Sequence, residues 1–147
     1  MTSNIKQSFG TAAAFTITNA NLTTSATAGW KSNAIDNSST LALDALVSIE
    51  LAAVNTAPAN SQAIILYAYS LIEGTAYAST GSGTIDGSEG TLTFPDFTTL
   101  AVALPVLGVV PYPVQNKAIN SPAFSVAACF GGILPVKWAS PCSITQG

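Results

Sequence analysis

The sequence predicts an all-β fold, an antiparallel two-sheet β-sandwich that is jelly-roll-like and has about six to eight strands. Two observations carry this prediction. Short apolar segments recur along the chain, and Gly, Pro, Asn or Ser bounds them about every 8–15 residues, as in strands joined by turns. In addition, Ala occurs mixed with Thr, Val and Ile, a combination that suits a pleated surface better than a helix.

The first half of the chain contains the clearest single element. A first strand is expected over Phe15–Thr18, where residues alternate, and a loop with one short strand over residues 26–37. In residues 41–54 the odd-numbered positions from Leu41 to Ala53 are all apolar, while the even-numbered row is mixed. This period of two predicts a long strand with one buried face. A helix is the alternative, because Leu, Ala, Asp and Glu all tolerate helices.

The remaining apolar runs predict the other strands. Residues 63–71 are rich in Ile, Leu and Tyr, and the turn at 55–61 makes them the hairpin partner or neighbour of 41–54. The Gly- and Ser-rich stretch 74–90 predicts a loop. Further strands are expected over 91–94, over 98–110 with an interruption at Pro105, over 124–130 and over 133–138. One domain spans residues 1–147, with an N-terminal arm at 1–12 and an irregular C-terminal tail at 139–147.

The composition excludes most enzyme and binding classes. Only 7% of the residues are charged and 48% are hydrophobic, and the chain has no His and no Arg. Without His there is no Ser-His-Asp triad and no His-ligated zinc site. Without Arg, four lysines in a chain of net charge −3 do not supply the electrostatics of nucleic-acid binding. We therefore predict a protein that is not an enzyme and that binds no cofactor, nucleic acid or small-molecule substrate.

Carboxylates are the only catalytic or metal-binding groups left to weigh. Asp86 and Glu89 lie in an Asp-Gly-Ser-Glu-Gly loop that could bind Ca²⁺ weakly, but the dense acidic ladder of an EF-hand is absent. A solvated turn is therefore expected there. Asp44 and Glu50 would lie about 20 Å apart on a strand, which is too far for a glycosidase pair. The sequence predicts no metal site and no catalytic site.

The chain also shows no sign of export or of a membrane span. Residues 1–10 lack the apolar run of a signal peptide, and the apolar stretch 100–110 is too short to cross a bilayer as a helix. We expect a soluble protein made in a cytosol, without membrane contact. In that compartment Cys129 and Cys142 are expected to be free thiols.

The shortage of charge is the strongest functional observation. A surface of small neutral residues suits a protein whose outside is covered by neighbours in a permanent assembly. Rigid prolines and the large faces of Tyr112 and Trp138 are typical of contact surfaces. The alternative is that both rings cap the domain's own core. The predicted contact residues are Pro111, Tyr112, Pro113, Asn116, Lys137 and Trp138.

Turn and packing motifs cover the chain from about Phe15 to Trp138. They lie at residues 28–32, 34–37, 43–47, 54–61, 87–95, 111–117 and 130–138. With these motifs the chain resembles a family of small virion proteins of tailed bacteriophages, and it is closest to the β-sandwich decoration, or cement, proteins of phage heads. The motifs are not catalytic, so the resemblance implies a family and a structural role, with no catalytic residue carried over.

The resemblance implies how the protein acts. Decoration proteins bind the outer surface of the major capsid protein lattice as dimers or trimers and clamp neighbouring capsomers, in a virion that is assembled in the host cytoplasm. Relatives of this kind continue after Trp138 with apolar strand sequence, so residues 139–147 predict that a closing strand is missing or comes from a neighbour. The alternatives are a tail, neck or fibre component, a receptor- or carbohydrate-binding β-sandwich on the virion, and a pilin-like or surface-layer subunit.

Overall fold

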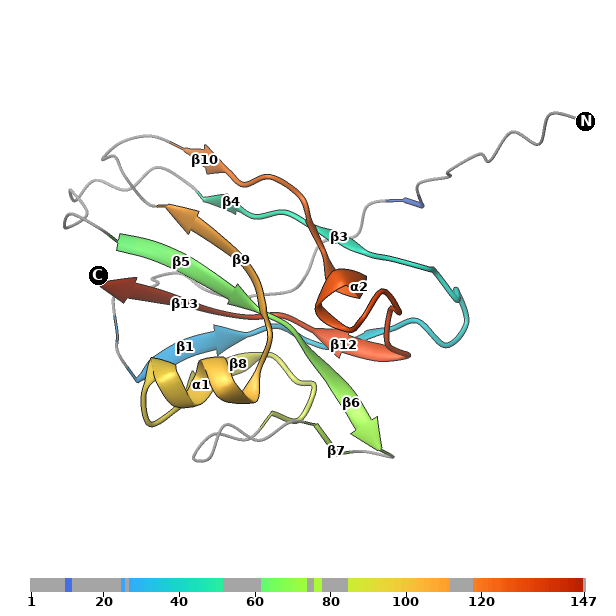
Figure 1. The fold of residues 1–147 in the computed structure, drawn as a ribbon, viewed down its shortest axis with the longest axis horizontal. Helices are drawn as coiled ribbons and strands as arrows, with labels where there is room; N and C mark the ends of the chain where they lie inside the picture. The colour runs from blue at the N-terminus through green and yellow to red at the C-terminus, as the bar shows by residue number, and fades with distance from the viewer. Residues whose placement is uncertain are drawn as a thin grey trace, which may run out of the picture.

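A computed structural model describes residues 10–11, 25, 27–51, 62–73, 76–77, 85–111 and 118–146. Strands dominate these residues, and two short helices accompany them (Figure 1). Every described strand pairing is antiparallel. The all-β prediction is confirmed at this level, but the strands are shorter and more numerous than expected. They form sheets of five, four, two and two strands.

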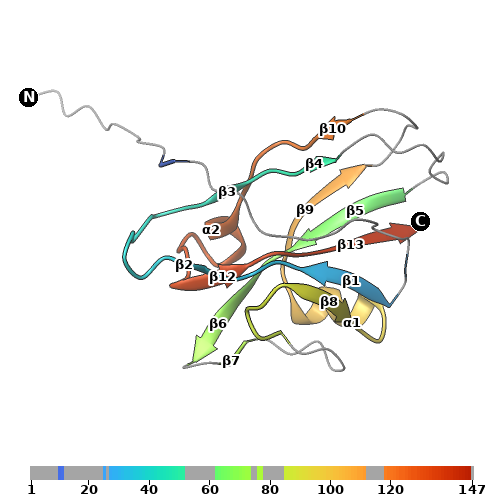
Figure 2. The same ribbon diagram turned by 180° about the vertical axis from the view of Figure 1, so that it is seen from behind.

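The largest sheet has its C-terminal strand in the centre. Its order is β8 (Gly90–Thr93), β1 (Ala28–Lys31), β13 (Pro141–Gln146), β5 (Gln62–Tyr67) and β9 (Val106–Pro111). Seen from behind, β8, β1 and β13 run side by side (Figure 2). The predicted strand at 91–94 is thus confirmed as β8, apart from a shift of one residue at each end.

The prediction of an irregular C-terminal tail is wrong. Cys142 pairs with Trp30 of β1 on one side and with Leu66 of β5 on the other. The residues from Cys142 to Thr145 alternate apolar and polar, which is the period of a strand. Pro141 stands at the first position of β13, where a missing backbone donor is tolerated. The chain's own C-terminal segment therefore supplies a central strand of the sheet.

Three segments pass from the five-stranded sheet into the four-stranded one. The second sheet has the order β2 (Ile35–Asp36), β12 (Lys137–Ala139), β6 (Tyr69–Glu73) and β7 (Ala76–Tyr77). Small buried residues mark the crossings: Ser32 leads from β1 toward β2, Ala68 separates β5 from β6, and Ser140 separates β12 from β13. Ser140 donates from Oγ to the Tyr67 carbonyl at 2.9 Å. The long strand expected over 63–71 is thus broken at Ala68, whose N–H donates to the Pro105 carbonyl.

The long strand predicted over 41–54 does not form in the described part of that segment. Two short strands stand there instead, β3 (Leu46–Val47) and β4 (Glu50–Leu51), paired with β11 (Phe124–Ser125) and β10 (Ile119–Asn120). In the odd-numbered apolar row, Leu41 and Leu43 are 72% and 88% exposed, whereas Ala45, Val47 and Ile49 pack against the core. The predicted hairpin with 63–71 is also wrong, since β5 pairs with β13 and β9.

Helices replace two of the expected strands. Helix α1 (Phe97–Ala103) begins at Asp96, whose side chain accepts a hydrogen bond from the Thr99 N–H at 2.7 Å. Helix α2 (Val126–Cys129) begins at Ser125, which caps it in the same way. Strand β9 then occupies the second half of the run at 98–110. The strand expected over 133–138 is confined to β12, and the one at Phe15–Thr18 lies outside the described residues, as does most of the arm at 1–12.

Two groups of buried side chains form the core. Ile64, Leu66 and Trp138 belong to a cluster between the five-stranded sheet and the β3–α2 side of the molecule. The other cluster contains Leu92 and Phe94 together with Leu100 and Leu104, which α1 and the residue after it contribute. Ile64 and Leu66 of β5 belong to the first cluster and Ile65 and Tyr67 to the second, so the two clusters pack on opposite faces of the five-stranded sheet.

Candidate functional site

The predicted contact residues do not come together on one described surface. Pro111 is exposed and ends β9, whereas Tyr112, Pro113 and Asn116 lie outside the described residues. Pro111 pairs with Ala63 of β5, which in turn pairs with Thr145 of β13. Lys137 lies eight positions before Thr145 in the chain. Lys137 lies in β12 of the four-stranded sheet, beyond the crossing at Ser140, so the two residues stand in different sheets.

The prediction that Trp138 contacts a partner is wrong for its ring. Trp138 is 3% exposed and packs in the same core cluster as Ile64 and Leu66. The alternative, that the ring caps the domain's own core, is what the structure shows. Its neighbour Lys137 is half-exposed in β12, with Nζ 3.5 Å from Asp36 Oδ2. Lys137 thus remains available at the surface, as part of an ion pair across β2 and β12.

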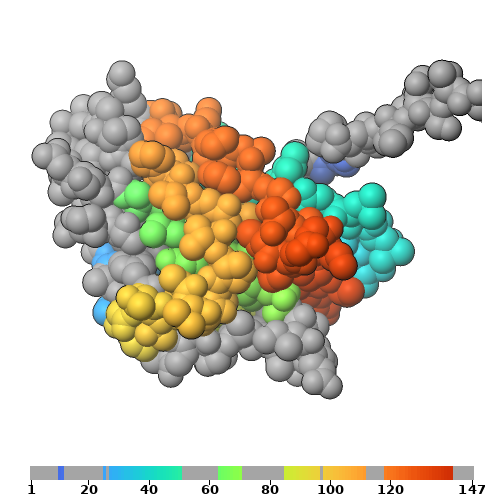
Figure 3. Space-filling view, viewed as in Figure 1, coloured from blue at the N-terminus to red at the C-terminus, as the bar shows by residue number. Residues whose placement is uncertain are grey.

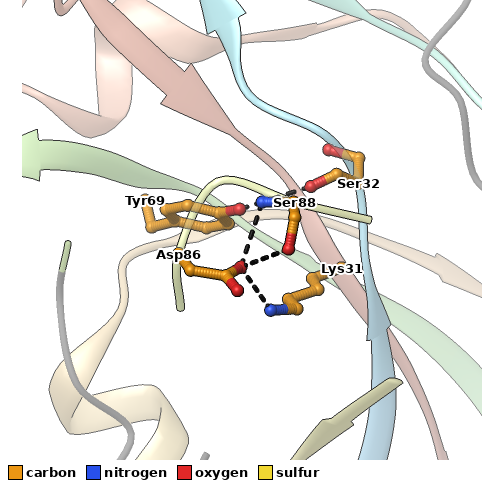
Figure 4. A network of polar contacts seen from close by, with 5 residues as sticks. All are labelled: Lys31, Ser32, Tyr69, Asp86 and Ser88. Carbon is orange, nitrogen blue, oxygen red and sulfur yellow. Dashed lines mark hydrogen bonds and ion pairs between the residues drawn. The ribbon is translucent and has the colours of Figure 1, made fainter. Parts of the chain in front are cut away.

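A buried lysine organises the polar network shown in Figure 4. The Lys31 side chain is 8% exposed, and its Nζ lies 2.5 Å from Asp86 Oδ1. The same oxygen accepts hydrogen bonds from the Ser88 N–H at 3.0 Å and the Ser88 hydroxyl at 2.6 Å. The hydrogen bond from Lys31 and those from Ser88 hold the pKa of Asp86 well below its usual range. The Asp86 carboxylate is therefore ionised at neutral pH.

This network fixes a turn. Three hydrogen bonds hold the ionised Asp86 carboxylate, which makes it a poor base. Gly87, at φ 75°, turns the backbone so that its carbonyl accepts a hydrogen bond from the Ala34 N–H at 2.8 Å. The solvated turn expected here is thus an exposed turn whose carboxylate is anchored to β1. A lysine at an inward-facing strand position is the sequence signal that could have revealed it.

The neighbouring crossing of the strands is polar but satisfied. The buried Tyr69 hydroxyl donates to the Ser32 carbonyl at 3.3 Å, beside the Lys31–Asp86 pair (Figure 4). The Ser32 hydroxyl accepts a hydrogen bond from the Ser140 N–H at 3.2 Å. Burial raises the pKa of Tyr67, the residue whose carbonyl Ser140 contacts. The hydrogen bonds of Tyr69, Ser32 and Ser140 hold the chain where it passes between sheets.

Asp44 joins the first half of the chain to α2. Its Oδ2 accepts a hydrogen bond from the Ser125 hydroxyl at 2.7 Å, and its Oδ1 accepts one from the Ala127 N–H at 2.9 Å. Burial acts to raise the pKa of Asp44, but these hydrogen bonds outweigh it and lower the pKa. Burial, together with the negative charge of Asp44, raises the pKa of the Cys129 thiol. Cys129 is a free thiol, as predicted, and its raised pKa makes it a weak nucleophile.

Exposed apolar side chains occur in the β2–β3 segment and in the residues that follow α2. The Asn37 N–H donates to the Val136 carbonyl at 2.7 Å and joins the two segments. Figure 3 shows them side by side at one end of the molecule, in cyan and orange-red. Five large apolar side chains in these segments are more than half exposed. We call them the apolar end: Leu41, Leu43, Leu46, Ile133 and Val136.

Sequence reasoning missed the apolar end because Leu41 and Leu43 were assigned to a buried strand face. Among the described residues, no group of three or more potential metal ligands lies together. Neither described helix is long and apolar enough to cross a membrane. Comparison with protein-family models, with curated proteins and with solved structures finds no match to this chain.

Proposed function

We propose that this protein is a structural component of a tailed-phage virion, a decoration protein that binds the major capsid protein lattice and stabilises the head. In this proposal it is not an enzyme, and its partners are the capsid lattice and further copies of itself as a dimer or trimer. The single observation that carries the proposal is the contrast between its surface and its charges. Large apolar side chains are exposed, while several charged side chains form ion pairs or hydrogen bonds with their own chain.

The charges support this contrast residue by residue. Lys31 and Lys137 form ion pairs with Asp86 and Asp36. The carboxylate of Asp44 accepts hydrogen bonds from residues beside α2. These groups are bound to their own chain and contribute less to surface hydration than free charges do. A single domain normally keeps charged side chains at its surface for solubility, so this pattern favours a surface that neighbours cover.

The exposed apolar residues support the same conclusion. Besides the apolar end, Val102 on α1 and Val106 and Val109 on β9 are exposed. Contiguous exposed apolar surface on a monomer marks a contact site with another molecule. Many modest contacts repeated over a shell can together hold it against outward pressure.

The fold proposed for this function is an antiparallel two-sheet sandwich of jelly-roll type. The passage of three segments between the five- and four-stranded sheets, at Ser32, Ala68 and Ser140, supports this arrangement. Jelly rolls built from two antiparallel sheets occur in viral capsid and lectin domains.

Binding to phage heads that lack this protein tests the proposal. The purified chain is mixed with such heads and with matched tails, and each particle is then pelleted. A decoration protein saturates the heads at a fixed ratio to the capsid protein, and the loaded heads retain their DNA at a higher temperature than bare heads. Binding to tails alone would assign the protein to a tail or fibre, and binding to neither would overturn a virion role.

A further inference from the structure

We propose that Asp86–Gly87 is a site of spontaneous backbone isomerisation and that Lys31 restrains this reaction in the folded chain. The product is isoaspartate, in which the main chain runs through the side-chain carbon of Asp86. The inference goes beyond the proposed virion role and does not depend on it, because it concerns the covalent chemistry of one turn. It is supported by the sequence of the turn, the conformation of Gly87, and the hydrogen bonds that hold the carboxylate.

The reaction joins the side chain of Asp86 to the main chain of the next residue. The Gly87 nitrogen attacks Asp86 Cγ, and the hydroxyl of the protonated carboxyl group leaves as water with the proton of the nitrogen. A second water then opens the five-membered succinimide. Cleavage at Cγ restores aspartate, whereas cleavage at the main-chain carbonyl carbon gives isoaspartate. The step needs only a reachable nitrogen and a carboxyl group that carries its proton.

The turn requires the residue that makes the attack easiest. Gly87 has a φ of 75°, in the left-handed region that glycine adopts without strain. Its carbonyl accepts a hydrogen bond from the Ala34 N–H at 2.8 Å, which ties the turn to the segment after β1. Because glycine has no Cβ, it hinders attack through its nitrogen less than any other residue. The fold therefore keeps a glycine after Asp86, and restraint of the reaction has to come from other residues.

The hydrogen bonds of the Asp86 carboxylate supply this restraint (Figure 4). Its Oδ1 accepts from Lys31 Nζ at 2.5 Å, from the Ser88 N–H at 3.0 Å and from the Ser88 hydroxyl at 2.6 Å. Three bonds to one oxygen hold the side chain in one orientation. They also keep the pKa of Asp86 well below its usual range, so the protonated form that the reaction needs is rare.

Lys31 contributes the part of the restraint that comes from outside the turn. Ser88 belongs to the same turn and moves with Asp86, whereas Lys31 lies on β1 with its side chain 8% exposed. A hydrogen bond from an ammonium to a carboxylate is roughly twice as strong as one between neutral groups. The hydrogen bond from Lys31 is also the largest cause of the lowered Asp86 pKa. Loss of Lys31 should therefore release the reaction.

Isoaspartate would not fit the turn in which it forms. The main chain gains a methylene carbon between Asp86 and Gly87, and the carboxylate is left on a shorter side chain. The Gly87 carbonyl then shifts away from the Ala34 N–H, and the carboxylate no longer reaches Lys31 in the same geometry. A single event at this turn thus removes both contacts that fix it to the β1 segment.

Incubation of the full chain at about pH 5, where an ordinary aspartic acid is still partly protonated, tests the proposal. Isoaspartate at residue 86 is measured by chromatography of the proteolytic peptide and by labelling with an isoaspartyl methyltransferase. The variants are Lys31→Met, which keeps an apolar side chain in the buried site, and Ser88→Ala, which removes one hydroxyl. Lys31→Met should form isoaspartate about ten times faster than the wild type or more, because each unit of pKa changes the protonated fraction tenfold. Ser88→Ala should show a smaller rise.

Asp44→Ala is the matched control for a general loss of stability. It removes hydrogen bonds from Ser125 and Ala127 beside α2, whereas Asp86 precedes β8 (Figure 1). We expect it to leave the rate at residue 86 unchanged, and wild type unfolded in urea gives the unrestrained rate. Ser88 is exposed, so its variant keeps the test valid if Lys31→Met does not fold.

Three outcomes would overturn the proposal. They are a wild type that forms isoaspartate as fast as the unfolded chain, variants at Lys31 and Ser88 that are no faster than the wild type, and an Asp44→Ala control that is accelerated as much as Lys31→Met. None of these outcomes bears on whether the chain binds phage heads.

Discussion

Removing Asp86 should destabilise the fold far more than its exposed position suggests. The Lys31 side chain is 8% exposed and the Asp86 side chain is 48% exposed. Water can therefore hydrate Asp86 when the lysine is removed, but it cannot hydrate the buried Lys31 when the aspartate is removed. Asp86→Ala takes this anion away from a buried ammonium. Breaking a buried pair costs about 3–5 kcal/mol. Because half of Asp86 faces solvent and is screened, we expect about 2 kcal/mol.

The reverse substitution supplies the control. Lys31→Met keeps the apolar stem of the side chain in its buried site and leaves Asp86 in contact with water and Ser88. We expect this variant to cost about 1 kcal/mol or less in the free energy of unfolding. Urea denaturation of the wild type and both variants at neutral pH, at one low protein concentration, measures the difference. If Lys31→Met proved the more damaging of the two, the argument from unequal burial would be refuted.

The same pair predicts the response to pH. The pKa of Asp86 is lowered in the folded chain, so the pair stabilises the fold fully above the pKa of an unfolded aspartate. That stabilisation is lost as the pH falls from about 4 toward the lower folded pKa. The gap in stability between the wild type and Asp86→Ala should therefore stay constant from neutral pH down to about pH 5. It should then narrow in more acidic solution, and a gap that widened in acid would contradict the assignment.

Three further substitutions test the packing, each by denaturation. Gly108→Ala should cost about 1–3 kcal/mol, because a Cβ there would meet the Phe124 ring at 2.6 Å; an unchanged stability would show that the ring moves freely. Trp138→Ala should cost about 3–5 kcal/mol in the free chain, as a core ring does, and a normally folded variant would return Trp138 to the list of contact residues. Asp44→Ala should cost about 1 kcal/mol through the hydrogen bonds to α2, whereas Asp44→Asn should retain part of that stability; equal losses would contradict an acceptor role.

The alternation of apolar and polar residues within a segment correctly predicted strands where that segment also pairs with neighbouring strands. The alternating segment 91–94 overlaps β8, and the run at 63–71 falls in β5 and β6 with a break at Ala68. The prediction failed at 41–54 because side chains distant in sequence decide the path there. Asp44 binds residues more than 80 positions away, beside α2, and draws the chain out of a straight strand. Periodicity within one segment carries no information about such contacts.

Two other failures have equally specific causes. The C-terminal strand β13 was missed although residues 142–145 alternate, because its strand character depends on β1 and β5, which flank it. Helix α1 was missed although Asp96 stands in the sequence as a typical N-cap, because the run after it is apolar enough for a strand.

The candidate site was predicted less well than the fold. One of its two aromatic anchors, Trp138, lies in the core, the other, Tyr112, lies outside the described residues, and the exposed leucines were assigned to the interior. Residue type alone predicts that a large apolar side chain will be covered, but whether its own chain or a partner covers it depends on the fold.

The central claim is that the exposed apolar surface of this protein is covered in an assembled virion. High-resolution imaging of the intact particle, with symmetry applied to the head, tests it most directly. We predict density for this chain on the outer surface of the capsid lattice, with Leu41 and Leu43 buried against another subunit. Density for the chain on the head that leaves both leucines facing solvent, or no density on the head at all, would contradict the account.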